Sequence, residues 1–222
     1  MLFAAGFGTR MGALTADRPK PLIEISGRAM LDRALDLARA VAPDRIVVNT
    51  HYKAGMIADH LAGQEVALSP ETPDILDTGG GLRAALPLLG TAPVYTLNPD
   101  AIWAGPNPLA LLRDAWRPDE MDALLLCLPP ERAHGRSGPD DFTADARGRI
   151  ARGPGLVYGG AQIIRTEALA EIPERAFSLN RLWDAMIAQG RAHALTYPGQ
   201  WCDVGHPGGI ALAENLLERA DV

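Results

Sequence analysis

The chain has 222 residues, of which 47% are hydrophobic and 22% are charged, and its formal net charge is −6. This length provides one sizeable hydrophobic core, so we expect a single domain over residues 1–222. The acidic balance argues against nucleic acid and anionic membranes as partners, because both bind a basic protein face.

Strand and helix patterns alternate along the chain. The clearest strand is the continuous apolar run 123–128, which is typical of a strand covered on both faces of its sheet. The clearest helix spans 30–41, with apolar residues on one face and charged residues on the other. We predict further strands at 45–49, 65–68, 94–97, 156–164 and 192–197, further helices at 53–61, 79–89, 109–116, 179–189 and 210–220, and a short hairpin at 142–150. This alternation predicts an α/β fold with a doubly wound, mainly parallel, Rossmann-like sheet, which binds ligands beyond the carboxyl ends of its strands.

The first residues carry the most informative motif. An apolar strand leads into Ala4-Ala5-Gly6-Phe7-Gly8-Thr9-Arg10, and Lys20 follows between two prolines. The two glycines allow phosphate oxygens to approach main-chain N–H groups, and Arg10 and Lys20 add fixed positive charge. The spacing differs from a Walker A loop and from a dinucleotide fingerprint, which needs a third glycine where Met11 stands. On the residues alone, the two glycines fit a purely steric strand-to-helix turn about as well.

This opening string resembles the signature of the sugar-1-phosphate nucleotidylyltransferases. The matching positions are Ala4, Ala5, Gly6, Gly8, Thr9, Arg10, Met11, Leu14, Thr15, Pro19, Lys20 and Pro21. The resemblance implies that Arg10 and Lys20 are catalytic and stabilise a nucleoside triphosphate and the pyrophosphate that leaves it. It also implies that the nucleotide is bound by Ala4, Ala5, Gly6, Gly8 and Thr9.

Asp100 is the first candidate metal ligand. Asn98-Pro99-Asp100 follows the predicted strand 94–97, and a carboxylate at the end of a strand is well placed to hold Mg²⁺, which prefers oxygen ligands. A turn-forming Asn-Pro-Asp explains the same residues without a metal. The family carries G-D or N-G-D here, which implies a metal-binding role for Asp100, with Pro99 in place of the usual glycine.

Asp203 is the second candidate ligand. The segment Trp201-Cys202-Asp203-Val204-Gly205-His206-Pro207 resembles the family motif W-x-D-V-G-T-P, whose aspartate binds magnesium. Taken alone, this aspartate fits a turn better. His206 replaces the usual threonine, and we interpret it as a loop residue because a hard-oxygen Mg²⁺ site does not require imidazole.

An acidic, glycine-rich segment forms a further constellation. Ser69-Pro70-Glu71 and Leu76-Asp77-Thr78-Gly79-Gly80-Gly81 resemble the part of N-acetylmuramate 1-phosphate uridylyltransferases in which an acidic residue precedes L-E-T-G-G-G, where other members show L-G-T-A. Consecutive glycines permit close approach of a base or ribose, and a helix N-terminus adds positive potential. The alternative is a helix entry turn. We predict nucleoside contacts from Glu71, Thr78, Gly79 and Gly80.

The sugar side of the site is less well marked. Tyr158-Gly159-Gly160 resembles the family segment (Y/F)-x-G, which implies that Gly160 lies under the sugar. Asn98 and Asp184 are further candidates for contacts with sugar hydroxyls. The second lysine of the family, which contacts the sugar phosphate, has no counterpart, and its candidate replacements are Arg149 and Arg152. Nucleotide binding is therefore expected in about residues 1–128, and sugar binding, with a small β region, in about residues 129–222.

The resemblance implies transfer of a nucleotidyl group, with Mg²⁺ as cofactor, from a nucleoside triphosphate to a sugar 1-phosphate. UTP and N-acetylmuramate 1-phosphate are the favoured substrates, and the product is a nucleotide-sugar for cell-wall recycling. Two alternative activities within the same class are those of mannose-1-phosphate guanylyltransferase and of cytidylyltransferases that act on phosphocholine. The alternative from another class is a catalytically silent, nucleotide-binding regulatory subunit. The joint presence of Arg10, Lys20, Asp100 and Asp203 argues against it.

The two cysteines and the lengths of the apolar runs indicate the cellular compartment in which we expect the protein. Cys127 and Cys202 lie far apart without metal-ligand spacing, which argues against a disulfide framework and a structural zinc site. No stretch approaches the ~20 apolar residues of a membrane span, and the motif that starts near Leu2 leaves no room for a signal peptide. We expect a cytoplasmic monomer or small homo-oligomer.

Overall fold

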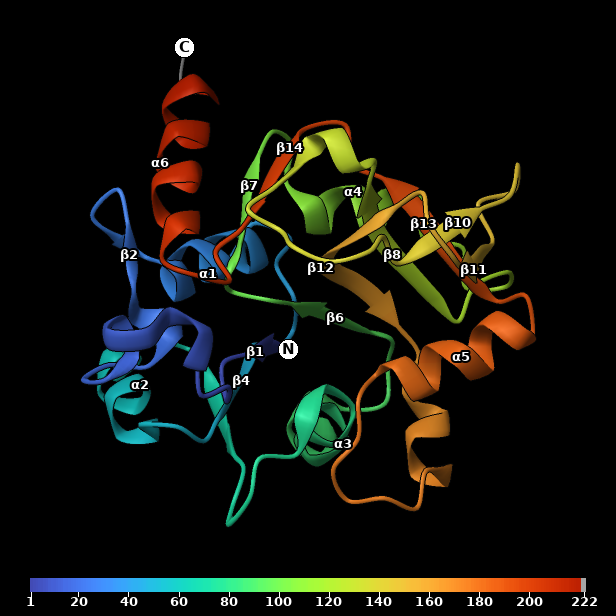
Figure 1. Cartoon of the computed structure of the whole chain (residues 1–222). Coiled ribbons are helices and arrows are strands. Elements are labelled where there is room, and N and C mark those ends of the chain that lie inside the picture. Colours follow the sequence, from blue (N-terminus) through green and yellow to red (C-terminus); the bar gives the residue numbers. More distant parts are fainter. Residues whose placement is uncertain (221–222) are drawn as a thin grey trace.

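The computed structural model describes residues 1–220 and contains a seven-stranded sheet with helices on both faces (Figure 1). The strand order is β13-β8-β12-β6-β1-β4-β5. The strands are β1 (Leu2–Phe3), β4 (Val47–Thr50), β5 (Ala67–Pro70), β6 (Val94–Leu97), β8 (Ala123–Leu128), β12 (Val157–Ile164) and β13 (Ala192–Thr196). Neighbouring strands are parallel except at β12, which pairs antiparallel with β6 and β8. The predicted α/β fold with a mainly parallel sheet is confirmed.

Different helices cover the two faces of the sheet. One face packs against α1 (Met30–Arg39), α2 (Ala54–His60) and α4 (Pro108–Ala115), and the other against α3 (Asp77–Leu89) and α5 (Asn180–Ala188). Strand β8 contributes to both cores, because successive side chains of a strand point to opposite faces. Leu124 and Leu126 join the first core, whereas Leu125 and Cys127 join the second. This double burial explains the continuous apolar run that predicts the strand.

A smaller, three-stranded sheet lies beside the main one. It consists of β7 (Ala101–Ala104), β14 (Gln200–Asp203) and β9 (Ala133–His134), and α6 (Gly208–Ala220) packs against it. The remaining elements are the hairpins β2–β3 (Glu24–Ile25, Arg28–Ala29) and β10–β11 (Phe142–Ala144, Ile150–Arg152) and the 3₁₀ segments η1 (Thr9–Thr15), η2 (Lys20–Leu22), η3 (Pro130–Arg132) and η4 (Glu167–Glu171). The predicted hairpin at 142–150 is confirmed, whereas β7 and β14 were not predicted.

The main sheet contains strands from both of the predicted parts, the nucleotide-binding part at about residues 1–128 and the sugar-binding part at about residues 129–222. Strands β12 and β13 belong to the later part of the chain, yet they pair with β6 and β8. The division into nucleotide and sugar parts stays a prediction about function, and residues 221–222 of the predicted domain lie outside the described residues. Within residues 1–220, no helix combines the length and apolar character needed to cross a membrane.

Candidate active site

Most of the predicted site residues lie near the carboxyl ends of β6, β1 and β5, in the part of the sheet where the strand order is β6-β1-β4-β5. Two cavities of about 230 Å³ each open there and share Phe3, Gly6 and Asp100 in their walls. The predicted residues that line the first cavity are Ala4, Gly6, Gly8, Thr9, Arg10, Lys20 and Asp100. Those that line the second cavity are Ala5, Gly6, Glu71, Thr78, Asn98 and Asp100. The chain thus gathers most of its predicted nucleotide and metal residues at one edge of the sheet.

Lys20 and Asp100 form an ion pair in the first cavity, with 2.5 Å between Nζ and Oδ2. The lysine begins η2, and the aspartate lies between β6 and β7. Their side chains are only 12% and 27% exposed, so the pair is partly shielded from water. Gly8, at φ +66°, makes room for the lysine, because a Cβ there would lie 2.9 Å from Lys20 Cβ.

Gly6 differs from Gly8 in what surrounds it. Apart from its own chain neighbours, no residue comes within 4 Å of a Cβ placed at this position, and Gly6 is exposed in the walls of both cavities. The steric explanation therefore accounts for Gly8, whereas Gly6 offers main chain to whatever occupies the cavities.

Asp203 lies beside Asp100 through the pairing of β14 with β7. This pairing sets Asp203 opposite Ala101, and the Val204 N–H donates to the Asp100 carbonyl oxygen at 3.0 Å. Burial raises the pKa of the Asp203 carboxyl, and the neighbouring Asp100 carboxylate raises it further. The two carboxylates therefore act on each other across the strand pair, and a cation between them would be stabilised.

Arg10 completes the charged cluster. The guanidinium of Arg10, together with Lys20, opposes the upward shift in the pKa of Asp203. A Cβ at Gly205 would lie 2.7 Å from Asp203 Oδ2 and 2.9 Å from Arg10 Nη1, so a side chain at this position would displace one or both of these groups. The predicted catalytic cations and the predicted metal ligands form one cluster, with Arg10, Lys20 and Asp100 in the wall of the first cavity.

The chemistry of this cluster fits a magnesium ion. Asp100 and Asp203 offer carboxylate oxygens, and Mg²⁺ is commonly held by one or two carboxylates together with substrate phosphates and water. Among residues 1–220, no group of three or more His, Cys, Asp and Glu side chains forms a metal site of its own. The imidazole Nε2 of His206 contacts the carbonyl oxygen of Gly135 at 3.1 Å, in keeping with its interpretation as a loop residue.

Glu71 lines the second cavity but does not offer it a free carboxylate. The side chain is 1% exposed. Its Oε1 accepts a hydrogen bond from Asn49 Nδ2 at 2.7 Å, and its Oε2 accepts one from the Leu76 N–H at 2.6 Å. The structure thus gives Glu71 a role within the protein that differs from the predicted contact with the nucleoside.

The three glycines at the start of α3 pack against the protein itself. A Cβ would meet a protein atom at 2.4 or 2.5 Å in each case: the Phe177 ring for Gly79, the Arg175 carbonyl oxygen for Gly80 and Glu71 Oε1 for Gly81. The N–H groups of Gly79 and Gly80 also donate to the Phe177 carbonyl oxygen. Packing against the protein is therefore sufficient to explain the glycines at these positions, and the predicted nucleoside contacts from Gly79 and Gly80 stay predictions. Thr78 does line the second cavity.

Asn98 and Gly160 meet at the second cavity. The Asn98 N–H donates to the Gly160 carbonyl oxygen at 2.9 Å. Gly160 has φ +85°, and a Cβ there would lie 3.0 Å from Asn98 Cβ and Nδ2. The glycine therefore makes room for the asparagine side chain, which lines the cavity. Their predicted contacts with the sugar stay predictions.

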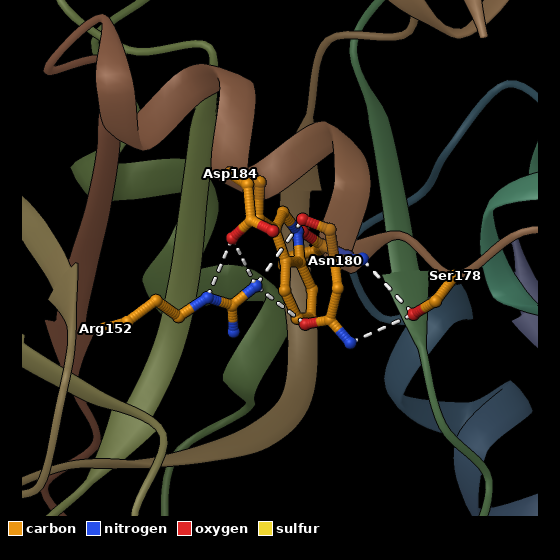
Figure 2. Close-up of polar contacts among 6 residues, drawn as sticks. Arg152, Ser178, Asn180 and Asp184 are labelled. Atoms are coloured by element: carbon orange, nitrogen blue, oxygen red, sulfur yellow. Dashed lines mark hydrogen bonds and ion pairs between the residues drawn. The ribbon is translucent and has the colours of Figure 1, made fainter.

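Asp184 lies outside both cavities, in contrast to the predicted substrate residue Asn98. Figure 2 shows it on α5, where it forms an ion pair with Arg152 at 2.8 Å next to Asn180. Its side chain is 60% exposed. A direct contact with sugar hydroxyls is therefore not supported, because the carboxylate is held by an arginine on the flank of the site.

The two candidate replacements for the missing lysine lie in different places. Arg149 pairs with Asp145 in the turn of the β10–β11 hairpin. Arg152 instead contacts the start of α5, and this end of the helix is joined to the second cavity by the Leu179 N–H, which donates to Thr78 Oγ1 at 2.9 Å. Of the two arginines, Arg152 is the one connected to the cavity wall.

Comparison with known proteins identifies the family. Residues 1–217 match the family model described as the MobA-like NTP transferase domain. The chain belongs to this family. It is 37% identical to the N-acetylmuramate alpha-1-phosphate uridylyltransferase of Caulobacter vibrioides, over 99% of the chain and 97% of that protein. It is 31% identical to the protein of the same name from Neisseria meningitidis serogroup B, over 92% of each. The protein is therefore a nucleotidyltransferase of the sugar-1-phosphate class.

A solved structure supports the fold of this nucleotidyltransferase. The crystal structure of HddC from Yersinia pseudotuberculosis superposes with a TM-score of 0.75 and covers 96% of both chains. At 20% sequence identity, this likeness bears on the fold alone.

Sequence reasoning missed two residues of the site of this nucleotidyltransferase. Asn49 joins Glu71 to the glycine-rich loop, and Gly205 separates Arg10 from Asp203. Asn49 carries a usable signal, because it is a polar residue near the carboxyl end of the buried strand β4, where ligands of such sheets bind. Gly205 had no comparable signal beyond its place in the Asp203 motif.

Proposed function

We propose that the protein transfers a uridylyl group from UTP to N-acetylmuramate 1-phosphate, with Mg²⁺ as cofactor, and forms a nucleotide-sugar for cell-wall recycling in the cytoplasm. The observation that carries the reaction is the single cluster of Arg10, Lys20, Asp100 and Asp203 at the first cavity. The choice of nucleotide and sugar is supported by the names of the relatives that are 37% and 31% identical.

The proposed chemistry is an in-line attack by a phosphate oxygen of the sugar 1-phosphate on the α-phosphorus of UTP. A phosphate monoester is a competent nucleophile at neutral pH, so the site needs alignment and charge neutralisation and no general base. Arg10 and Lys20 hold the triphosphate and stabilise the charge of the departing pyrophosphate. Asp100 and Asp203 would hold a magnesium ion, which when bound would further neutralise the phosphate charge.

Substrate choice is tested by a turnover screen of the four nucleoside triphosphates against several sugar 1-phosphates and phosphocholine, with pyrophosphate release as the readout. We expect UTP with N-acetylmuramate 1-phosphate to give the highest kcat/KM, because segment 77–81 is the part of the sequence that most separates the uridylyltransferases from the guanylyltransferases. A preference for GTP with mannose 1-phosphate would contradict this assignment and leave only the enzyme class. Nucleotide binding without turnover in any combination would favour a regulatory subunit.

We expect Arg152→Gln to raise the KM for the sugar 1-phosphate about tenfold and to leave the KM for UTP unchanged. Asp184 and Asn180 hold two nitrogens of the guanidinium, and within residues 1–220 Nη1 makes no hydrogen bond that competes with a phosphate oxygen. Arg149→Gln is the matched control, because Arg149 pairs with Asp145 in the hairpin turn. Equal changes in both variants, or an unchanged sugar KM, would remove Arg152 from the sugar site.

A further inference from the structure

A chain of buried hydrogen bonds runs beneath the second cavity. The Ala4 N–H donates to Asn49 Oδ1 at 2.7 Å, and Asn49 Nδ2 donates to Glu71 Oε1 at 2.7 Å. The chain ends where the Leu76 N–H donates to Glu71 Oε2 at 2.6 Å. Asn49 and Glu71 are 3% and 1% exposed, so these bonds are made out of contact with bulk water. Buried polar groups of this kind are costly to leave unpaired.

The direction of every bond in this chain is fixed. Both ends are backbone N–H groups, which only donate, so Asn49 must turn its oxygen to Ala4 and its amide nitrogen to Glu71. Glu71 accepts at both oxygens. The α3 backbone closes the remaining space, since a Cβ at Gly81 would lie 2.4 Å from Glu71 Oε1. Glu71 therefore cannot turn towards a ligand without leaving two donors unpaired.

The hydrogen bonds connect the two walls between which a nucleotide would lie. Ala4 begins the glycine-rich loop, and it is followed by Ala5 and Gly6 in one wall of the second cavity. Leu76 precedes Asp77 and Thr78, which belong to the other wall. Asn49 and Glu71 come from β4 and from the residue after β5, so the connection crosses the ends of three adjacent strands.

We propose that Glu71 is a positioning residue, which acts through Asn49 and the Leu76 N–H to hold the two walls of the second cavity at the spacing that binds the nucleoside triphosphate. This inference rests on the proposed function only in placing the nucleoside in the second cavity. It assigns Glu71 no contact with the substrate.

Exchange of the carboxylate at position 71 with the amide at position 49 tests the proposal. In Glu71→Gln, one carboxylate oxygen becomes an amide nitrogen, which must face the donor of either Asn49 or Leu76. In Asn49→Asp, a carboxylate oxygen takes the place of the amide nitrogen and faces Glu71 Oε1, so two acceptors meet and no hydrogen bond forms between them. In the double variant, the glutamine side chain at position 71 would accept from the Leu76 N–H and donate to the aspartate side chain at position 49. That aspartate would in turn accept from the Ala4 N–H, so every bond is made again and only the central one is reversed.

We expect each single variant to raise the KM for the nucleoside triphosphate about tenfold and to lower the Tm by about 5 °C, the scale of one unpaired buried polar group. The KM for the sugar 1-phosphate should stay within about twofold of the wild type, because Asn98 and Gly160 are not part of this chain of bonds. The double variant should recover both the nucleotide KM and the Tm. Glu65→Gln, an exposed position just before β5, is the control and should change neither.

The outcomes separate this inference from the proposed function. All variants are assayed well below their Tm, with the nucleoside triphosphate that the wild type uses best. If the wild type prefers GTP, the uridylyl assignment is contradicted, but the test of Glu71 and Asn49 is still valid because it is then carried out with GTP. A lower Tm with an unchanged nucleotide KM in the single variants would overturn the positioning role. So would a double variant that is no better than the singles. If neither single variant folds, a folded double variant with a normal nucleotide KM supports the inference, and an unfolded one overturns it.

Discussion

Asp100→Asn and Asp203→Asn are each expected to lower turnover by several orders of magnitude, and the double variant is expected to lose little more. The two carboxylates lie close together through the pairing of β7 with β14, and the charge of Asp100 acts on Asp203. If both hold one Mg²⁺, the first substitution already displaces the metal, so the second has little left to remove. Strong non-additivity of this kind is the signature of groups that act as a unit. The measurement is pyrophosphate release at saturating substrates and Mg²⁺.

Nucleotide binding and metal supply provide the controls for this experiment. UTP should still bind to both single variants with a modest loss, because the glycine-rich loop, Arg10 and Lys20 are unchanged. Asp17→Asn removes an exposed carboxylate from the same loop region and should leave turnover intact. Independent, multiplicative losses in the double variant would show that the aspartates do not share a metal, and full activity of the wild type in EDTA would end the magnesium proposal.

The parts of the fold that follow from local pattern could be predicted from the sequence. The run 123–128 is apolar throughout because both faces of β8 are covered, and this is visible without knowledge of any partner strand. The convergence of Arg10, Lys20 and Asp100 could also be anticipated, because their segments follow strands and the carboxyl ends of parallel strands meet at one edge. Only the resemblance to a family gave these positions their expected roles.

The parts that depend on register between distant segments could not be predicted. Nothing within 157–164 indicates that β12 runs antiparallel between β6 and β8, since that depends on the path of the preceding chain. The glycines that begin α3 resemble ligand contacts in the sequence because the segment 175–177, which covers them, lies far away along the chain. Asp184 is a sugar candidate for a similar reason, because its partner Arg152 is known only from the fold. Long-range packing competes with ligands for the same residue types, and a single sequence does not separate the two.

Arg10→Ala and Lys20→Ala are each expected to lower turnover by about 10² or more while the fold stays intact, which is the scale of losing one preorganised donor to the transition state. Both cations line the first cavity, where the charge of the triphosphate and of the leaving pyrophosphate would lie. Lys20 also neutralises Asp100 at 2.5 Å, so its removal leaves Asp100 and Asp203 with less compensation. Lys20→Ala is therefore expected to change the Mg²⁺ concentration needed for half-maximal rate, whereas Arg10→Ala acts chiefly on the triphosphate.

Two residues of the same types provide matched controls for this last prediction. Arg18 lies in the same loop region but pairs with Asp17 at the surface, and Lys53, the one other lysine of the chain, lies over the ring of Tyr52. Arg18→Ala and Lys53→Ala remove the same charges from the protein, so a loss confined to Arg10→Ala and Lys20→Ala assigns the effect to the cavity and not to net charge. Pyrophosphate release and thermal unfolding are measured for all four variants. Unchanged release by Arg10→Ala or by Lys20→Ala would remove that residue from the mechanism.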